Sequence, residues 1–186
     1  MPGREKTTEY DGRRTIIIGD VNTGKTRLTE NVLARWVAQD RSQEIVVLDL
    51  APETKETIGG RIHLPAGFQG GVLATTIMPP RLSGRDEDEA ATLAEANAAA
   101  IETLLKDSRL ETCSILVIND VTLYLQAGKY ERLWAVIHPV KTILINAYYG
   151  HSFPDYQLSR QERRLTDRLI QDCDRVIRLP DPDRHD

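Results

Sequence analysis

The segment Gly19-Asp20-Val21-Asn22-Thr23-Gly24-Lys25-Thr26 is the feature that most constrains how this chain can fold. It fits the pattern G-x-x-x-x-G-K-[ST], which joins a strand to a helix by a tight loop. Residues 13–18 before it form a short β-branched run, as expected for a buried strand. After it, apolar residues recur on one face of a predicted helix: Leu28, Val32, Leu33, Trp36 and Val37.

The chemistry of this loop points to a phosphate ligand. Its two glycines allow the backbone to approach an anion closely, because they have no Cβ and tolerate positive φ. Successive N–H groups and the N-terminus of the following helix then face the same anion. In this pattern Lys25 reaches the β- and γ-phosphates, and the Thr26 hydroxyl binds Mg²⁺. The predicted nucleotide-binding residues are Gly19, Asp20, Val21, Asn22, Thr23, Gly24, Lys25, Thr26 and Arg27. The alternative is a plain glycine-rich turn.

Strand-like and helix-like segments alternate along the rest of the chain. Strands are expected at 44–50, 71–77, 113–120, 142–147 and 175–179, the last at a sheet edge. Helices are expected from Asp86 to Leu105, from Tyr130 to Ile137 and from Ser159 to Asp172; Asp86 with Glu89, and Ser159 with Glu162, have capping-box spacing. Apolar strands that alternate with helices predict an α/β fold, a three-layer αβα sandwich with a mainly parallel sheet.

Composition favours one ordinary globular domain. The 186 residues are 40% hydrophobic and 28% charged, and the net charge of −4 gives no sign of nucleic-acid or membrane binding. We expect a flexible arm at 1–12, a single nucleotide-binding domain at 13–179 and a polar tail at 180–186. The N-terminal residues lack an apolar segment, so no signal peptide is predicted and the expected location is cytoplasmic. Cys113 and Cys173 are expected as small buried side chains.

Asp120 is the second strong signal, because four apolar residues run into Asn119-Asp120 at a predicted strand end. A carboxylate there can hold Mg²⁺, so Thr26 and Asp120 are the predicted metal ligands, and Lys25, Asp120 and Asp49 the predicted catalytic residues. A register shift of one residue would exchange the roles of Asn119 and Asp120. Asp49 ends the preceding strand, and an ordinary loop role is its alternative.

Two irregular segments, 51–71 and 78–86, follow the second and third predicted strands. Loops at this end of a parallel sheet are often functional, and we expect both to close over the nucleotide. Arg61, Arg81 and Arg85 are candidates for an arginine that stabilises a transferring phosphate, within the chain or across a homodimer. Each could instead be a solvated surface arginine.

The segment 146–154 follows the fifth predicted strand, where a nucleotide base could lie. Tyr148 or Tyr149 could stack on a purine, or the segment could be an ordinary packed loop with the Tyr hydroxyls at its surface. The chain lacks the pattern [NT]-K-x-D that reads guanine, so ATP is the expected nucleotide and GTP remains open.

These motifs and their order resemble the P-loop NTPase superfamily, and the resemblance spans Arg13 to Leu179. It implies nucleotide binding with Mg²⁺ as cofactor, but it names no reaction. A fainter resemblance is to the P-loop ATP:corrinoid adenosyltransferases, carried by residues 72–105 and by Asp120, Thr122 and Tyr124. The sequence departs from that family at the loop, which usually reads G-x-G-K-G-K-T, and at Asn119-Asp120, which is usually Asp-Glu.

Three functions therefore remain open from the sequence. The chain is expected to be a Mg-dependent ATPase or ATP-using transferase with an unidentified second substrate or protein partner. An adenosyltransferase would release triphosphate. A nucleotide-dependent switch without turnover would act through a conformational change.

Overall fold

The computed structural model describes residues 9–53 and 60–180. Within these residues, six parallel strands form one sheet in the order β3-β2-β4-β5-β1-β6. Their bounds are β1 Arg14–Gly19, β2 Ile45–Asp49, β3 Gly71–Ala74, β4 Ile115–Asn119, β5 Thr142–Tyr148 and β6 Arg175–Arg178. The predicted α/β fold with a parallel sheet is confirmed. The expected strand at 71–77 is shorter, and the last strand does lie at an edge, beside β1.

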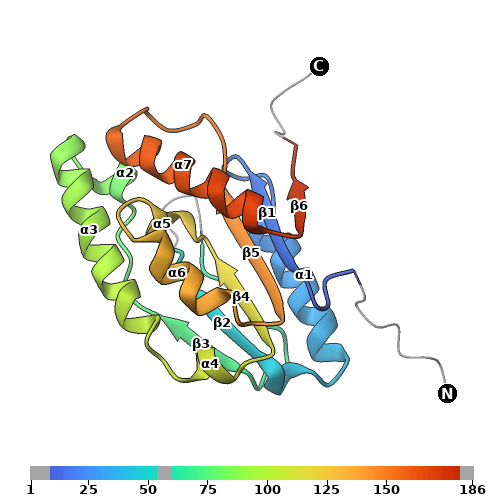
Figure 1. The fold of residues 1–186 in the computed structure, drawn as a ribbon. Coiled ribbons are helices and arrows are strands. Elements are labelled where there is room, and N and C mark those ends of the chain that lie inside the picture. Colours follow the sequence, from blue (N-terminus) through green and yellow to red (C-terminus); the bar gives the residue numbers. More distant parts are fainter. Residues whose placement is uncertain (1–8, 54–59, 181–186) are drawn as a thin grey trace.

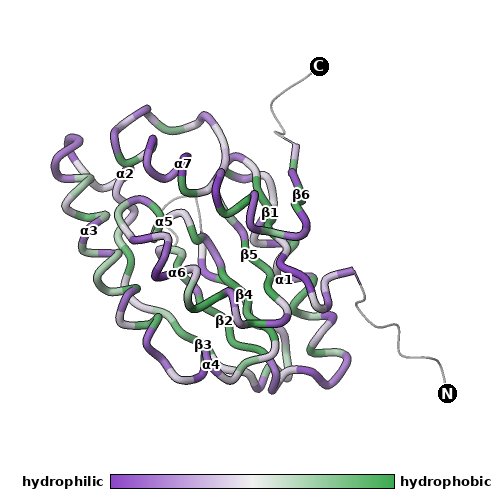
Figure 2. The backbone as a smooth tube through the Cα atoms, in the orientation of Figure 1, coloured by the Kyte–Doolittle hydropathy of each residue, from purple (hydrophilic) through white to green (hydrophobic). Residues whose placement is uncertain are grey.

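Successive strand residues point to opposite faces of the sheet, and each face has its own hydrophobic core. In β1, Ile16 and Ile18 belong to one cluster and Ile17 to the other. The same alternation holds in β4. Leu116 and Ile118 belong to the cluster of Ile16, and Ile115 and Val117 belong to the cluster of Ile17. Figure 2 shows the middle strands hydrophobic over most of their length. The four middle strands are therefore buried on both sides, as is typical of all-parallel sheets.

Helices cover both faces (Figure 1). The helix α1 (Lys25–Ala38) lies on one face, where Val32, Leu33 and Trp36 are buried. The other face is covered by the long helix α3 (Glu87–Leu104) and by α5, α6 and α7. Their bounds are α5 Thr122–Leu125, α6 Tyr130–Ile137 and α7 Gln157–Asp172. The structure also has short helices that the sequence did not predict. They are α2 Pro80–Ser83, α4 Arg109–Thr112 and a 3-10 helix at Ser42–Glu44.

The first described residues pack against α1. Tyr10 is buried and meets Trp36 edge-on at 6.3 Å between ring centroids, and the Gly12 amide donates to the Thr142 hydroxyl at 2.9 Å. The rest of the expected arm, residues 1–8, and most of the expected tail, residues 181–186, lie outside the described residues. No helix in the described part of the chain is long and apolar enough to cross a membrane.

The two predicted capping boxes have different outcomes. Asp86 caps α3 by accepting a hydrogen bond from the Glu89 amide at 2.8 Å, although the Glu89 carboxylate returns to Arg85 and not to Asp86. Ser159 lies inside α7, which begins after Tyr156, and its hydroxyl donates to the Pro154 carbonyl at 2.8 Å. The predicted Ser159–Glu162 capping box is therefore wrong.

We predict that Asp86→Ala lowers the free energy of unfolding by about 1 kcal/mol, because an N-cap hydrogen bond is lost. Ser159→Ala is the matched control and should change it by less than about half as much, since Ser159 caps no helix. Urea unfolding of the two variants measures both values. Equal losses would show that the Asp86 cap contributes nothing particular to α3.

Candidate active site

The carboxyl ends of β1, β5, β4 and β2 meet at one edge of the sheet, and a cavity of about 440 Å³ opens there. Residues from distant parts of the chain line it, as the sequence predicted: Lys25, Thr26, Arg61, Arg81, Asn119, Asp120 and Tyr148. We call this the central cavity. Its volume suits a small-molecule ligand.

The glycine loop, residues 19–26, enters the cavity between β1 and α1. Asn22 and Gly24 have positive φ, at 56° and 87°. A Cβ on Gly19 would lie 2.6 Å from the Thr23 hydroxyl, so this close approach requires glycine. Gly24 is the N-cap of α1 and provides no side-chain hydrogen bond, which leaves the first amides of the helix available. Such a helix start is an anion site.

Lys25 begins α1 and lies half-buried over this loop. Its ammonium group donates to the Asp20 carbonyl. Burial lowers its pKa, and the charges of Asp120 and Asp20 oppose that shift. Lys25 thus closes the loop with a polar contact that a phosphate could replace.

The Asp20 side chain does not face the loop amides that follow Val21. Its carboxylate accepts hydrogen bonds from the Val21 amide at 2.6 Å, the Ser152 hydroxyl at 2.6 Å and the His151 amide at 2.8 Å. Burial disfavours its charge, but the hydrogen bonds from Ser152, His151 and Val21 outweigh burial and lower its pKa. Asp20 therefore fastens the segment after β5 to the glycine loop.

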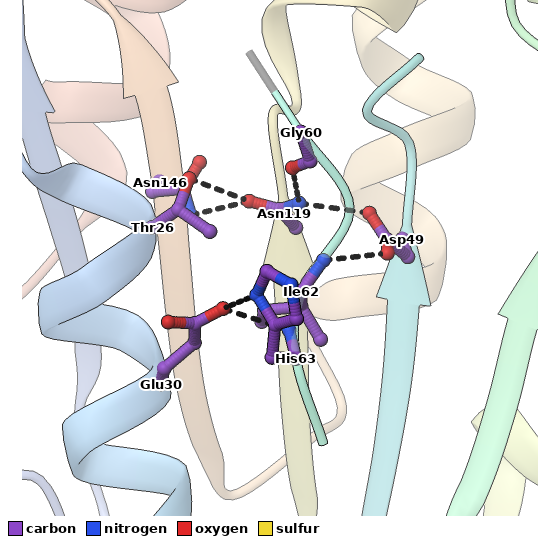
Figure 3. Close-up of polar contacts among 8 residues, drawn as sticks. All are labelled: Thr26, Glu30, Asp49, Gly60, Ile62, His63, Asn119 and Asn146. Carbon is purple, nitrogen blue, oxygen red and sulfur yellow. Dashed lines mark hydrogen bonds and ion pairs between the residues drawn. The ribbon is translucent and has the colours of Figure 1, made fainter. Parts of the chain in front are cut away.

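A buried network around Asn119 joins four segments of the site (Figure 3). The Asn119 Nδ2 donates to Asp49 Oδ1 at 2.8 Å and to the Gly60 carbonyl at 3.1 Å. Its Oδ1 accepts from Asn146 Nδ2 at 2.8 Å and from the Thr26 hydroxyl at 3.5 Å. Because Asp49 and Gly60 offer only acceptors, the amide orientation is fixed and its oxygen must face Thr26.

Asp49 is buried and its oxygens are occupied. Besides Asn119, it accepts hydrogen bonds from the Ile62 amide at 2.9 Å and the Ala51 amide at 3.3 Å. Next to this segment, Glu30 of α1 holds both the amide and the ring Nδ1 of His63, at 2.7 and 2.9 Å (Figure 3). Both contacts hold the segment after Gly60 over the end of β2.

Asp120 lies just past β4 and differs in its surroundings from Asn119. It has a positive φ of 56°, its carboxylate accepts from the Thr122 hydroxyl at 2.5 Å, and its amide donates to Asn146 Oδ1 at 2.8 Å. Burial raises its pKa, against the opposing effects of Thr122 and the nearby charges of Lys25 and Arg81. Asn119, and not Asp120, is the residue that contacts Thr26. The predicted Thr26–Asp120 metal pair stays a prediction.

The three candidate arginines have three different environments. Arg85 is exposed and pairs with Glu89 at 2.9 Å, and it does not line the cavity. Arg61 lines the cavity, donates to the Thr75 carbonyl at 2.7 Å and leaves its buried Nε without a partner in the described residues. Arg81, from α2, is almost fully buried between the cavity and α7.

Arg81 forms a buried ion pair with Glu162 of α7 at 3.0 Å. Its guanidinium carbon also lies 4.2 Å from the Phe153 ring centroid and 5.0 Å from that of Tyr148. Gln126 Nε2 donates to the same carboxylate at 2.8 Å. Burial raises the pKa of Glu162 to about 7, against the attraction of Arg81. Sequence reasoning assigned Glu162 to a helix cap and missed this contact.

The two tyrosines after β5 also separate. Tyr148 lines the central cavity, whereas the Tyr149 hydroxyl donates to Asp167 at 2.7 Å and its ring lies under Arg163. Only Tyr148 is therefore placed where it could contact a cavity ligand. Asn146, which the sequence placed at the start of the segment expected near a nucleotide base, bridges Asn119 and Thr29 through its amide nitrogen, at 2.8 and 3.1 Å.

We predict that the stability of the protein falls as pH rises from about 4.5 to about 7, because folded Glu162 holds its proton more strongly than the unfolded chain does. Glu162→Gln should flatten this part of the pH profile. The measurement is urea unfolding at several pH values. Glu131→Gln is the control, since the hydrogen bond from Arg168 lowers the Glu131 pKa and keeps it ionised in this range. An unchanged slope in Glu162→Gln would contradict the assignment.

Among the comparisons with known proteins, one solved structure agrees with this architecture. No family model matches the sequence, and no curated protein matches it either. Among solved structures, the flagellar accessory protein FlaH from Methanocaldococcus jannaschii aligns with a TM-score of 0.51 and 11% identity, over 90% of this chain and 71% of that chain. The Pif1 helicase from Candida albicans aligns with a TM-score of only 0.34 and 12% identity, over 91% of this chain and 36% of that chain. The parallel sheet and its similarity to FlaH, with the glycine loop between β1 and α1, show that the chain has an α/β fold of the P-loop NTPase type.

Proposed function

We propose that the central cavity binds a Mg-nucleotide, with ATP as the expected ligand, and that the chain is an ATPase or an ATP-using transferase. The observation that carries this proposal is the glycine loop at the uncapped start of α1, with Lys25 half-buried above it. A helix start with free amides and an adjacent ammonium group is suited to bind phosphates.

The proposed roles follow the contacts of each residue. The loop amides and Lys25 bind the phosphates, and nucleotide binding moves the Lys25 ammonium from the Asp20 carbonyl to a phosphate oxygen. Tyr148, on the cavity wall, is placed to contact the base or a second substrate. Arg81, held in place by its ion pair with Glu162, presents fixed N–H donors beside the cavity, as electrostatic stabilisation of a transferring group requires.

The donor set beside Lys25 fits Mg²⁺. Thr26 and Asn119 offer two neutral oxygens on neighbouring elements, and Mg²⁺ prefers oxygen ligands. Within the described residues no group of three His, Cys, Asp or Glu side chains is arranged to hold a metal. This agrees with a Mg²⁺ that enters together with nucleotide phosphates, which would complete its ligands. When bound, the ion would neutralise charge on the phosphates.

Two carboxylates compete for the role of general base. Asp120 lines the central cavity, and its raised pKa reflects burial near Lys25. Asp49 is occupied by Asn119 and the Ile62 amide, so we assign it to holding the segment after Gly60. We therefore propose Asp120 as the group that orients or deprotonates an attacking nucleophile.

A nucleotide-dependent switch is the second candidate, and Asn119 favours it. A neutral amide contacts Thr26 where the sequence pattern led us to expect a carboxylate, so the metal would be held weakly. Incubation with Mg-ATP, alone and with a reduced corrinoid as adenosyl acceptor, separates the candidates. Phosphate release indicates an ATPase, triphosphate release with the corrinoid indicates an adenosyltransferase, and binding without product in either mixture favours a switch.

We predict that Lys25→Ala weakens ATP binding at least tenfold, because a charge-assisted contact to phosphate is lost. Isothermal titration calorimetry measures the affinity. Arg35→Ala removes an exposed positive charge from the same helix and should leave affinity unchanged. Equal affinity of wild type and Lys25→Ala would contradict nucleotide binding in the loop.

A second prediction assigns the metal ligands. If Thr26 and Asn119 hold Mg²⁺, Asn119→Ala should retain metal-free ATP binding but lose most of the gain in affinity from added Mg²⁺. Asp120→Ala should keep that gain and lose turnover. Titrating Mg²⁺ into each variant with ATP present measures the gain in affinity. The reverse pattern would restore the Asp120 assignment made from the sequence.

A further inference from the structure

A second cavity, of about 740 Å³, lies between α7 and the segment that follows β5. We call it the α7 cavity. It shares Arg81, Tyr148 and Phe153 with the central cavity, but it contains none of the glycine-loop residues. Its volume lies in the range of small-molecule sites. Apart from Arg81 and Tyr148, none of the residues that line it has a role in the proposed nucleotide chemistry.

Positive charge prevails in the α7 cavity, although the whole chain has a net charge of −4. Its charged lining consists of five arginines and three acids: Arg81, Arg160, Arg163, Arg164, Arg168, Asp155, Glu162 and Asp167. Arg81 is neutralised by Glu162 at 3.0 Å. Arg160 has a long contact with the exposed Asp155 at 3.4 Å, and Arg168 pairs with Glu131 at 2.7 Å.

Two of these arginines have no carboxylate partner among the described residues. Arg163 donates to the Gly150 carbonyl at 2.6 Å, and its guanidinium carbon lies 3.9 Å from the Tyr149 ring centroid. These contacts orient Arg163 but leave its charge uncompensated. Arg164 is exposed, and its side chain has no hydrogen bond or ion pair within the part of the chain that is described. An oriented guanidinium and a free one that line the same cavity are suited to bind an anion.

The arginines on α7 also repel one another. Arg160, Arg164 and Arg168 are four residues apart, so they lie on one face of the helix. Like charges at this spacing destabilise a helix. A cavity that concentrates such repulsion gains stability when an anion binds in it.

We propose that the α7 cavity binds a small polyanion with phosphate or carboxylate groups, at a site separate from the nucleotide site. Arg163 and Arg164 are its main contacts, because their charges are not already used. Arg81, Tyr148 and Phe153 line both cavities, so ligands in the two sites are expected to affect each other's affinity.

The test uses tripolyphosphate as the probe and the Lys25→Ala variant as the host protein, so that the glycine loop contributes little. Calorimetry should detect binding, and adding Arg164→Glu should weaken it at least tenfold, because attraction becomes repulsion. Arg164 is exposed and unpaired in the described chain, so this change should leave the fold intact. Arg163→Lys keeps the charge but removes bidentate hydrogen bonding, and it should weaken binding less than Arg164→Glu does.

Arg132→Glu is the matched control, because Arg132 is an exposed arginine that does not line the α7 cavity. No tripolyphosphate binding, or an equal loss in Arg132→Glu and Arg164→Glu, would overturn the proposal. A single-stranded DNA oligonucleotide is the second probe. If it binds through Arg164 while tripolyphosphate does not, the site recognises nucleic acid and the small-anion proposal is wrong. None of these outcomes depends on whether Lys25 binds ATP.

Discussion

The hydrogen bonds of Asn119 are the interaction on which the site geometry depends. One buried amide at the end of β4 contacts Asp49 on β2, Gly60 in the following segment, Asn146 on β5 and Thr26 on α1. A buried amide is stable only when its groups are paired, so these segments have one arrangement in which all of them are satisfied. The amide thus sets the distance between the glycine loop and the segment after β2.

The ion pair of Arg81 and Glu162 plays the same part on the other side of the cavity. It joins α2 to α7 across the two cavities, and both side chains are almost completely buried. Removing one partner of such a pair leaves a buried charge unpaired and costs about 3–5 kcal/mol. The pair therefore fixes α2 and its arginine beside the central cavity. A ligand that contacts Arg81 would also change the contact of Arg81 with Glu162 on α7.

What the sequence could predict was local, and what it could not predict was long-range. The glycine loop, α1 and the Asp86 cap are each encoded within a few residues, so spacing alone located them. The place of β5 between β1 and β4 depends on strand pairing, and so the contact of Asn146 with Asn119 had no local signal. Arg81 and Glu162 are 81 positions apart, and Glu162 also fits a capping box that the fold does not use.

Three charged groups of the site, Lys25, Asp120 and Asp49, already have partners in the described residues. Lys25 contacts the Asp20 carbonyl, Asp120 accepts from Thr122, and Asp49 accepts from the Ile62 amide. A nucleotide must therefore exchange these hydrogen bonds for its own, and its affinity is the difference between the two sets. A ligand shifts a conformation only by its differential contacts. Since Asn119 links Thr26 to Asp49 and Gly60, a metal bound at Thr26 would compete for the Asn119 oxygen and pull on the segment after Gly60. That segment is where a conformational response to nucleotide should begin.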